Sequence, residues 1–197
     1  MGTPFTFSAG ASTFTVPAGP PPAGTCVIGP SIPAGTTVTV AETIPAGDTV
    51  ANISVVPATQ IVGTPNLATG SVDVTMGSGV TEETFTDKRT GYLEICKRGD
   101  VKGNATFSVS PGALGPFVVP AGACSPAIEV VADSVSIHEM SPSGVMAGCS
   151  TIPPGQQGKC DLDTQTSTVT VSPGDVSAQT IAIITNKPAG GGPGTRR

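Results

Sequence analysis

The fold is decided by two similar stretches, V-T-V-A-E-T-I-P-A-G (38–47) and V-S-I-H-E-M-S-P-S-G (135–144). Each is a short run of strand-forming residues that carries one glutamate and stops at a Pro/Gly turn. Side chains alternate between the two faces of a strand, and Glu42 and Glu139 fall in phase with the apolar residues that precede them. The pattern therefore predicts β-structure with an inward-facing glutamate, and it does so twice.

The composition predicts an all-β protein. The chain has 197 residues with 26 Gly and 20 Pro, and only 12% of the residues are charged. Val, Thr and Ile dominate between the Pro/Gly clusters, which is typical of short strands joined by tight turns. No apolar run approaches about 20 residues, so we expect no transmembrane segment. The net charge of −5, with no basic stripe, excludes a nucleic-acid partner.

The chain repeats itself in colinear order, which predicts two tandem β-sandwich domains, 1–90 and 91–188, followed by a flexible tail, 189–197. Four further pairs of segments carry the repeat: F-T-F-S-A-G (5–10) with A-T-F-S-V-S (105–110), F-T-V-P-A-G (14–19) with F-V-V-P-A-G (117–122), S-V-D-V-T-M-G-S-G-V (71–80) with T-V-T-V-S-P-G-D-V (168–176), and T-F-T-D-K (84–88) with I-I-T-N-K (183–187).

One element has no counterpart in the first repeat. The second repeat opens with G-Y-L-E-I-C-K-R-G-D (91–100), in which Leu93, Ile95 and Lys97 share one face. We therefore expect the first domain to lack its first strand. Such a domain presents an unpaired sheet edge, and an added strand from a donor is the natural partner for that edge.

The five cysteines fit the same repeat. Cys149 and Cys160 flank a turn-rich loop that a disulfide closes at low cost. Cys96, on the opening strand, is expected to pair with Cys124. Cys26 is the repeat partner of Cys124, so it is predicted to be free or to bridge between chains. The alternative is that all five are reduced, buried thiols.

Three polar residues share the inward phase of the second repeat. Lys97 follows Leu93 and Ile95, Glu139 follows its strand's apolar residues, and Asn186 follows Ala182 and Ile184 in phase. Burial disfavours the charged form of a lysine, and a neutral amine is a competent nucleophile. The alternatives are a buried Lys97–Glu139 ion pair with Asn186 as a hydrogen-bond partner, or a Lys97 whose amine reaches solvent.

This pattern resembles the collagen-adhesin B-type (Cna-B, prealbumin-like) domains of bacterial surface proteins. The resemblance rests on L-E-I-C-K (93–97), E-M-S-P-S-G (139–144) and I-I-T-N-K (183–187). It implies immunoglobulin-like or prealbumin-like sandwiches, and a spontaneous isopeptide bond in which Lys97 is the nucleophile, Asn186 the electrophile and Glu139 the proton shuttle. The cysteines depart from the usual isopeptide pattern.

The first repeat keeps only part of this set. It has Glu42 and Asp87 at the matching positions but no lysine on an opening strand, so these are vestigial positions that cannot form the bond within this chain. The alternative for Glu42 is a hydrogen bond to threonine hydroxyls or to backbone at the strand end.

These observations favour a structural stalk module of a secreted or cell-surface bacterial protein, although the sequence shows no signal peptide. Its expected partners are neighbouring domains of a longer chain. The alternative is an extracellular module that binds a glycan or host protein through exposed loops, although aromatic residues are few. An enzyme is disfavoured beyond the single-turnover bond, because His138 is the only histidine. We expect no cofactor and no metal.

Overall fold

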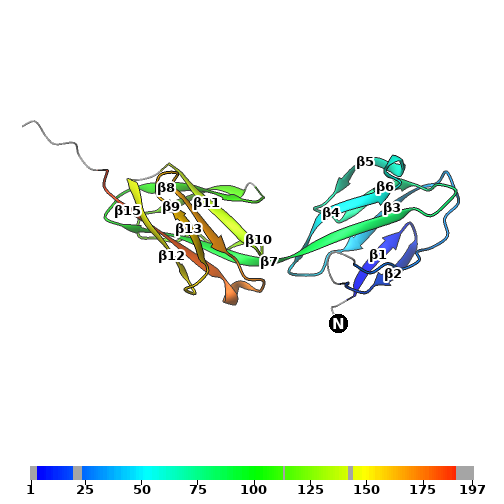
Figure 1. The fold of residues 1–197 in the computed structure, drawn as a ribbon, viewed down its shortest axis with the longest axis horizontal. Coiled ribbons are helices and arrows are strands. Elements are labelled where there is room, and N and C mark those ends of the chain that lie inside the picture. Colours follow the sequence, from blue (N-terminus) through cyan, green and yellow to red (C-terminus); the bar gives the residue numbers. More distant parts are fainter. Residues whose placement is uncertain (1–3, 20–23, 113, 142–143, 190–197) are drawn as a thin grey trace, which may run out of the picture. The chain divides into compact units, whose positions relative to one another are not determined.

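The protein is almost entirely β-structure, as its composition predicts. The computed structural model describes residues 4–19, 24–112, 114–141 and 144–189, and within them it has fifteen strands and two short 3₁₀ helices, η1 (Ala58–Gln60) and η2 (Val176–Ala178) (Figure 1). No described helix is long and apolar enough to cross a bilayer. Most of the expected tail, 190–197, lies outside the described residues.

The chain divides into two compact units, Met1–Lys88 and Arg89–Arg197. The first unit has a five-stranded sheet in the order β2-β1-β3-β6-β5, and its β4 pairs with β7. The strands of this unit, with β7 extending beyond it, are β1 (Phe5–Ala9), β2 (Ser12–Val16), β3 (Thr37–Thr43), β4 (Asp48–Val56), β5 (Ile61–Asn66), β6 (Ser71–Thr75) and β7 (Glu82–Gly99).

The core of the first unit lies between its five-stranded sheet and the layer formed by β4 and the first half of β7. Alternate residues of β3 and β6, such as Val40 and Val74, are buried and pack with Val50 and Ile53 of β4. Phe7 of β1 stacks against Phe14 and meets Phe85 of β7 edge-on, with ring centroids 5.9 and 5.0 Å apart. A two-stranded layer therefore covers a five-stranded one.

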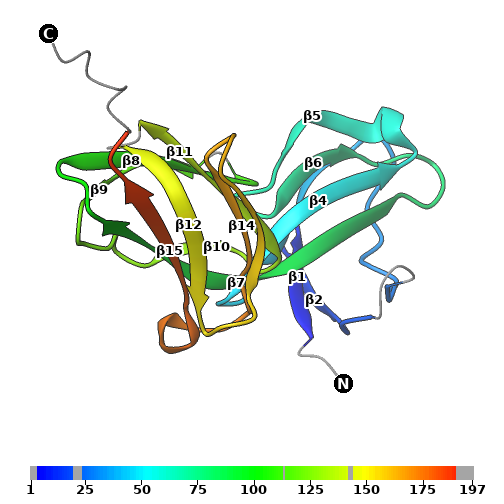
Figure 2. The ribbon, with the colours of Figure 1, turned by 60° about the vertical axis from the view of Figure 1, so that its left-hand side comes forward.

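The second unit has two full sheets, in the orders β10-β7-β15-β12 and β13-β14-β11-β8-β9. Its core contains Leu93 and Ile184 from the first sheet and Phe107 and Ile137 from the second, so the sheets pack face to face. Figure 2 shows β15 beside β12, its antiparallel neighbour. The strands added here are β8 (Asn104–Ser110), β9 (Leu114–Pro120), β10 (Ile128–Val131), β11 (Ser134–Ser141), β12 (Val145–Ile152), β13 (Gln157–Asp161), β14 (Thr166–Thr170) and β15 (Thr180–Lys187).

Strand β7 belongs to both units. Its residues from Glu82 onward continue without a break through Tyr92 to Gly99. The sequence predicts a domain boundary at 90 and 91, with a closing strand before it and an opening strand after it. The structure joins these two into one strand, because no turn residue interrupts the run except Gly91, whose missing Cβ lets Ser172 approach.

The repeat is visible in strand register. Glu42 lies opposite Phe7 across β1 and β3, and Glu139 lies opposite Phe107 across β8 and β11. One sequence match is wrong by two residues, however. Thr37 pairs with Thr75 where Ser134 pairs with Thr170, so 71–75 corresponds to 166–170 rather than to 168–172. A shift of two residues keeps every side chain on its own face, which is why alternation alone did not reveal it.

Candidate functional site

Lys97 is held in the core of the second unit by backbone pairing on both edges of β7. On one edge Ile184 of β15 lies beside it in a parallel ladder. On the other edge the Lys97 N–H donates to the carbonyl of Ala123 at 2.9 Å, and the Lys97 carbonyl accepts from Gly122 at 3.0 Å. Since Leu93 and Ile95 on the same face are fully buried, the lysine side chain enters the sandwich with them.

Glu139 approaches from the opposite sheet. It lies on β11 next to buried Ile137 in phase, its N–H donates to the carbonyl of Gln165 at 3.0 Å, and the pairing with β8 shifts register directly after it. Asn186, near the end of β15, is also buried and follows Ala182 and Ile184 on the inner face. The three predicted residues therefore come from three strands and meet in one core.

The glutamate bridges the other two residues. The Lys97 Nζ atom lies 2.8 Å from Oε1 of Glu139, and both side chains are fully buried. The Asn186 Nδ2 atom donates to Oε1 and Oε2 of Glu139 at 3.0 and 3.1 Å. The Oδ1 atom of Asn186 has no hydrogen-bond partner among the described residues. The interpretation in which Lys97 reaches solvent is therefore wrong, and the buried ion pair is the arrangement present.

The electrostatics of this site weaken the ammonium form. Burial lowers the pKa of Lys97, while the hydrogen bond and the charge of Glu139 act in the opposite direction. A proton that moves from the ammonium to the carboxylate leaves a neutral amine beside a neutral acid. The protonated glutamate can then donate to the asparagine amide, so the group can carry out acid–base chemistry in a dry environment.

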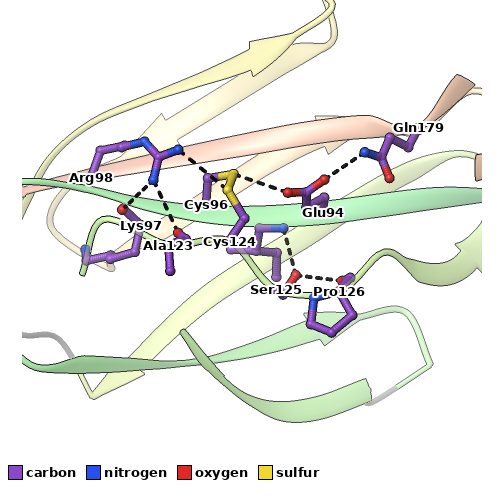
Figure 3. The surroundings of a disulfide bond; sticks show 10 residues. Glu94, Cys96, Lys97, Arg98, Ala123, Cys124, Ser125, Pro126 and Gln179 are labelled. Atoms are coloured by element: carbon purple, nitrogen blue, oxygen red, sulfur yellow. Dashed lines mark hydrogen bonds between the residues drawn. A yellow bond between two sulfur atoms is a disulfide. The ribbon is translucent and has the colours of Figure 1, made fainter. Parts of the chain in front are cut away.

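A disulfide ties the other face of the same strand. Cys96 is joined to Cys124, and Cys149 is joined to Cys160, which are the pairs expected from the sequence. Around the first disulfide the Arg98 guanidinium donates to the carbonyls of Lys97 and Ala123 at 3.3 and 3.4 Å (Figure 3). Two disulfides indicate a protein of an oxidising, non-cytoplasmic compartment.

Polar side chains also flank this disulfide. The Glu94 carboxylate accepts from Nε2 of Gln179 at 2.7 Å, and its other oxygen lies 3.7 Å from the sulfur of Cys96 (Figure 3). The side chains of Glu94, Cys96 and Cys124 are close enough together to resemble a metal site. Both sulfurs are committed to the disulfide, so they are not thiolate ligands.

The first unit repeats the acid without its cation. Glu42 is only 4% exposed, and neither of its carboxylate oxygens has a hydrogen-bond partner among the described residues. The alternative of a hydrogen bond to threonine or backbone is therefore wrong for its side chain. Burial, followed by the charges of the neighbouring Asp87 and Asp48, raises the pKa of Glu42 to about 7. Burial also raises the pKa of Asp87.

Sequence reasoning missed Glu83. It shares the half-buried phase of β7 with Phe85 and Asp87, its Oε1 atom has no hydrogen-bond partner among the described residues, and burial raises its pKa. Glu83 has the same inward phase as Asp87 in the alternating pattern of this strand, so the sequence could have identified it in the same way. The inner face of this half of β7 therefore bears two carboxyl groups.

Comparisons with known proteins leave the family open. No protein-family model matches the chain, and no curated protein matches it. Among solved structures, "The Bacillus anthracis TIE protein" aligns over 93% of this chain and 34% of its own length, with 13% identity and a TM-score of 0.31. The chain thus spans about a third of that protein's length.

Proposed function

We propose that the chain is a structural stalk module of a secreted or cell-surface bacterial protein, built from immunoglobulin-like or prealbumin-like sandwiches of the collagen-adhesin B type. The observation that carries the proposal is the bridge from Glu139 to both Lys97 and Asn186 in a fully buried site. Two disulfides in the same unit support it, because covalent ties resist force and proteolysis in extracellular proteins.

The proposed chemistry is a single turnover. Glu139 takes a proton from the Lys97 ammonium, and the neutral amine attacks the side-chain carbonyl carbon of Asn186. Glu139 gives this proton to the amide nitrogen of Asn186, and the C–N bond breaks to release one ammonia. The attacking nitrogen passes its second proton to Glu139, so one amide replaces another and the glutamate is left protonated. Strand pairing supplies the high effective concentration of the two reacting groups. The product joins β7 to β15 covalently, beside the existing backbone ladder.

Intact mass measured with and without reductant tests this proposal. We expect the reduced chain to weigh one ammonia less than its sequence requires, because reduction restores the hydrogens of the disulfides but not the ammonia. Glu139→Gln should restore the full mass, since an amide cannot shuttle the proton.

The matched control is Glu94→Gln, on the strand of Lys97 but on its other face, which should still lose ammonia. A wild-type chain with the full calculated mass after reduction would rule out the covalent bond and leave Lys97 and Glu139 as an ion pair.

A further inference from the structure

Among the described residues, no strand of the first unit corresponds to the opening strand that completes the second unit. In the second unit, Leu93–Gly99 of β7 lie beside β15 on one edge, and β10 and the Ala123–Ser125 segment flank the other. The first half of β7 is the repeat counterpart of β15, and β4 is the first-unit strand that pairs with it. Among the described strands, none pairs with the other edge of this first half of β7, so the backbone groups on that edge are available to an added strand.

The inner wall of this open position carries two acidic side chains, Glu42 and Asp87. Glu42 occupies the place of Glu139 in strand register, and the sequence repeat matches Asp87 with Asn186. Both oxygens of Glu42 and the Oδ1 atom of Asp87 are buried without hydrogen-bond partners among the described residues. The groups that shift the pKa values of these two acids are burial and other carboxyl groups, with no cation among them. An ammonium group placed between two buried carboxyl groups would neutralise them and supply hydrogen-bond donors to their unpartnered oxygens.

Cys26 adds an independent observation, which comes from its position in the repeat. It follows the F-T-V-P-A-G motif as Cys124 follows F-V-V-P-A-G, and Cys124 bonds to the opening strand through Cys96. Cys26 itself is a free, exposed thiol.

The segment after Cys26 is also incomplete. The segment after Cys124 leads into β10, which pairs with β7. Residues 24–33 form no strand, and within them Val27 and Ile28 are 41% and 101% exposed. A segment whose partner strand is missing keeps its apolar side chains in solvent.

We propose that the first unit is a receptor for one added β-strand that carries adjacent cysteine and lysine residues, with the lysine entering between Glu42 and Asp87 and the cysteine bonding to Cys26. Alternation requires apolar residues two and four positions before the lysine, as Ile95 and Leu93 precede Lys97. The disulfide forms by exchange: the Cys26 thiolate attacks a mixed disulfide of the incoming cysteine, and the small thiol leaves. This proposal does not depend on the isopeptide bond.

The occupant is not the matching strand of this chain. Cys96–Lys97 is the only Cys-Lys pair in the sequence, and it is committed to the second unit by the disulfide to Cys124 and by the ion pair to Glu139. The strand must therefore be an additional one with the same pattern.

The test uses the full chain and a synthetic peptide with the sequence of residues 92–98, Y-L-E-I-C-K-R, whose cysteine carries a small-thiol mixed disulfide. Intact mass follows formation of the adduct at Cys26. We expect the peptide to react at least about tenfold faster than a scrambled peptide that keeps the Cys-Lys pair, because binding raises the local concentration of the disulfide. Protein Cys26→Ser should form no adduct, yet the peptide should still raise its melting temperature.

Matched variants isolate the lysine contact. The peptide carrying Lys97→Met keeps the length and the cysteine, and it should lose most of the rate advantage. Protein Glu42→Gln should lose it as well, whereas protein Glu129→Gln in the second unit should not. Equal rates for the scrambled and native peptides would overturn the proposal, as would an undiminished rate with the Lys97→Met peptide. A Cys26–Cys26 dimer that excludes the peptide would also overturn it, in favour of a second copy as the occupant.

Discussion

Glu42 and Glu139 occupy the same position in the two units, opposite a phenylalanine and at the same place on their strands. Their surroundings differ in charge. Glu139 faces an ammonium group at 2.8 Å, while Glu42 faces Asp87 and Asp48. A carboxyl group that is buried beside other carboxyl groups favours its protonated form, so burial, and after it the charge of Asp87, raises the pKa of Glu42.

This difference predicts a pH dependence for the first unit. Because the folded pKa of Glu42, about 7, lies above its ordinary value of 4.5, the folded state binds the proton more tightly. The resulting stabilisation is complete below the ordinary value and is lost as the pH rises through 7. Glu42→Gln should therefore stabilise the unit by up to about 3 kcal/mol at pH 8 and leave it unchanged at pH 4.

Denaturant unfolding at a series of pH values measures this effect. The variant and the wild type should converge at acid pH and diverge at alkaline pH. Asp87 and Glu83 also have raised pKa values, so some pH dependence will remain in the variant. Parallel curves for the two proteins would mean that Glu42 does not titrate in the folded state as described.

At the scale of elements, β7 and β15 form the parallel pair that holds the candidate site together. Their ladder runs from Leu93 beside Thr180 to Gly99 beside Asn186. The pair ends at Gly99, where the backbone has φ +111° and an added Cβ would lie 1.8 Å from the carbonyl oxygen of Asn186. Only glycine allows the two backbones to come this close, so the contact requires a glycine at position 99, next to the candidate site.

Gly99→Ala should therefore separate the ends of these strands. We expect a loss of more than about 3 kcal/mol in the unfolding free energy of the second unit, together with a failure to lose ammonia, since Asn186 would be displaced. Gly122→Ala is the matched control: it also has a positive φ, +84°, but no atom within 4 Å of the added Cβ. Its cost should stay near 1–2 kcal/mol, with the chemistry unchanged. Equal losses in both variants would contradict the role given to the close contact.

At the scale of the whole molecule, the two units differ in how they are stabilised. Both disulfides lie in the second unit, and the described cysteine of the first unit is a free thiol. The second unit also has two sheets of at least four strands each, whereas the first has a two-stranded layer against five. Fewer strands bury less apolar surface, so the first unit is expected to be the less stable one.

Calorimetry should accordingly show two transitions, of which only the upper one responds to reductant. The disulfides close segments with separations of 28 and 11 residues, and loop entropy gives each about 3 kcal/mol, slightly more for the longer one. Reduction should lower the upper transition by more than about 10 °C and leave the lower one in place. A shift of both transitions together would show that the units do not unfold independently.

The sequence by itself determined which way the side chains face. Alternation is a local property of extended backbone, so the inward phase of Lys97, Glu139 and Asn186 could be predicted, and so could the all-β class. The turn-rich loop between Cys149 and Cys160, and the positions of Cys96 and Cys124 in the second repeat, were enough to identify both disulfide pairs.

Tertiary structure alone decided what those faces meet. Register between distant strands depends on contacts that no local pattern encodes, so the two-residue shift of β14, the continuity of β7 and the close approach at Gly99 could not be predicted. The same holds for the polar groups. Glu42 and Glu139 have the same local pattern, and only the packing of the strands places Nζ of Lys97 2.8 Å from Glu139 and leaves both carboxylate oxygens of Glu42 without a partner among the described residues. The strength of a charge interaction depends on the distance between the two groups, and that distance is set only when the chain folds.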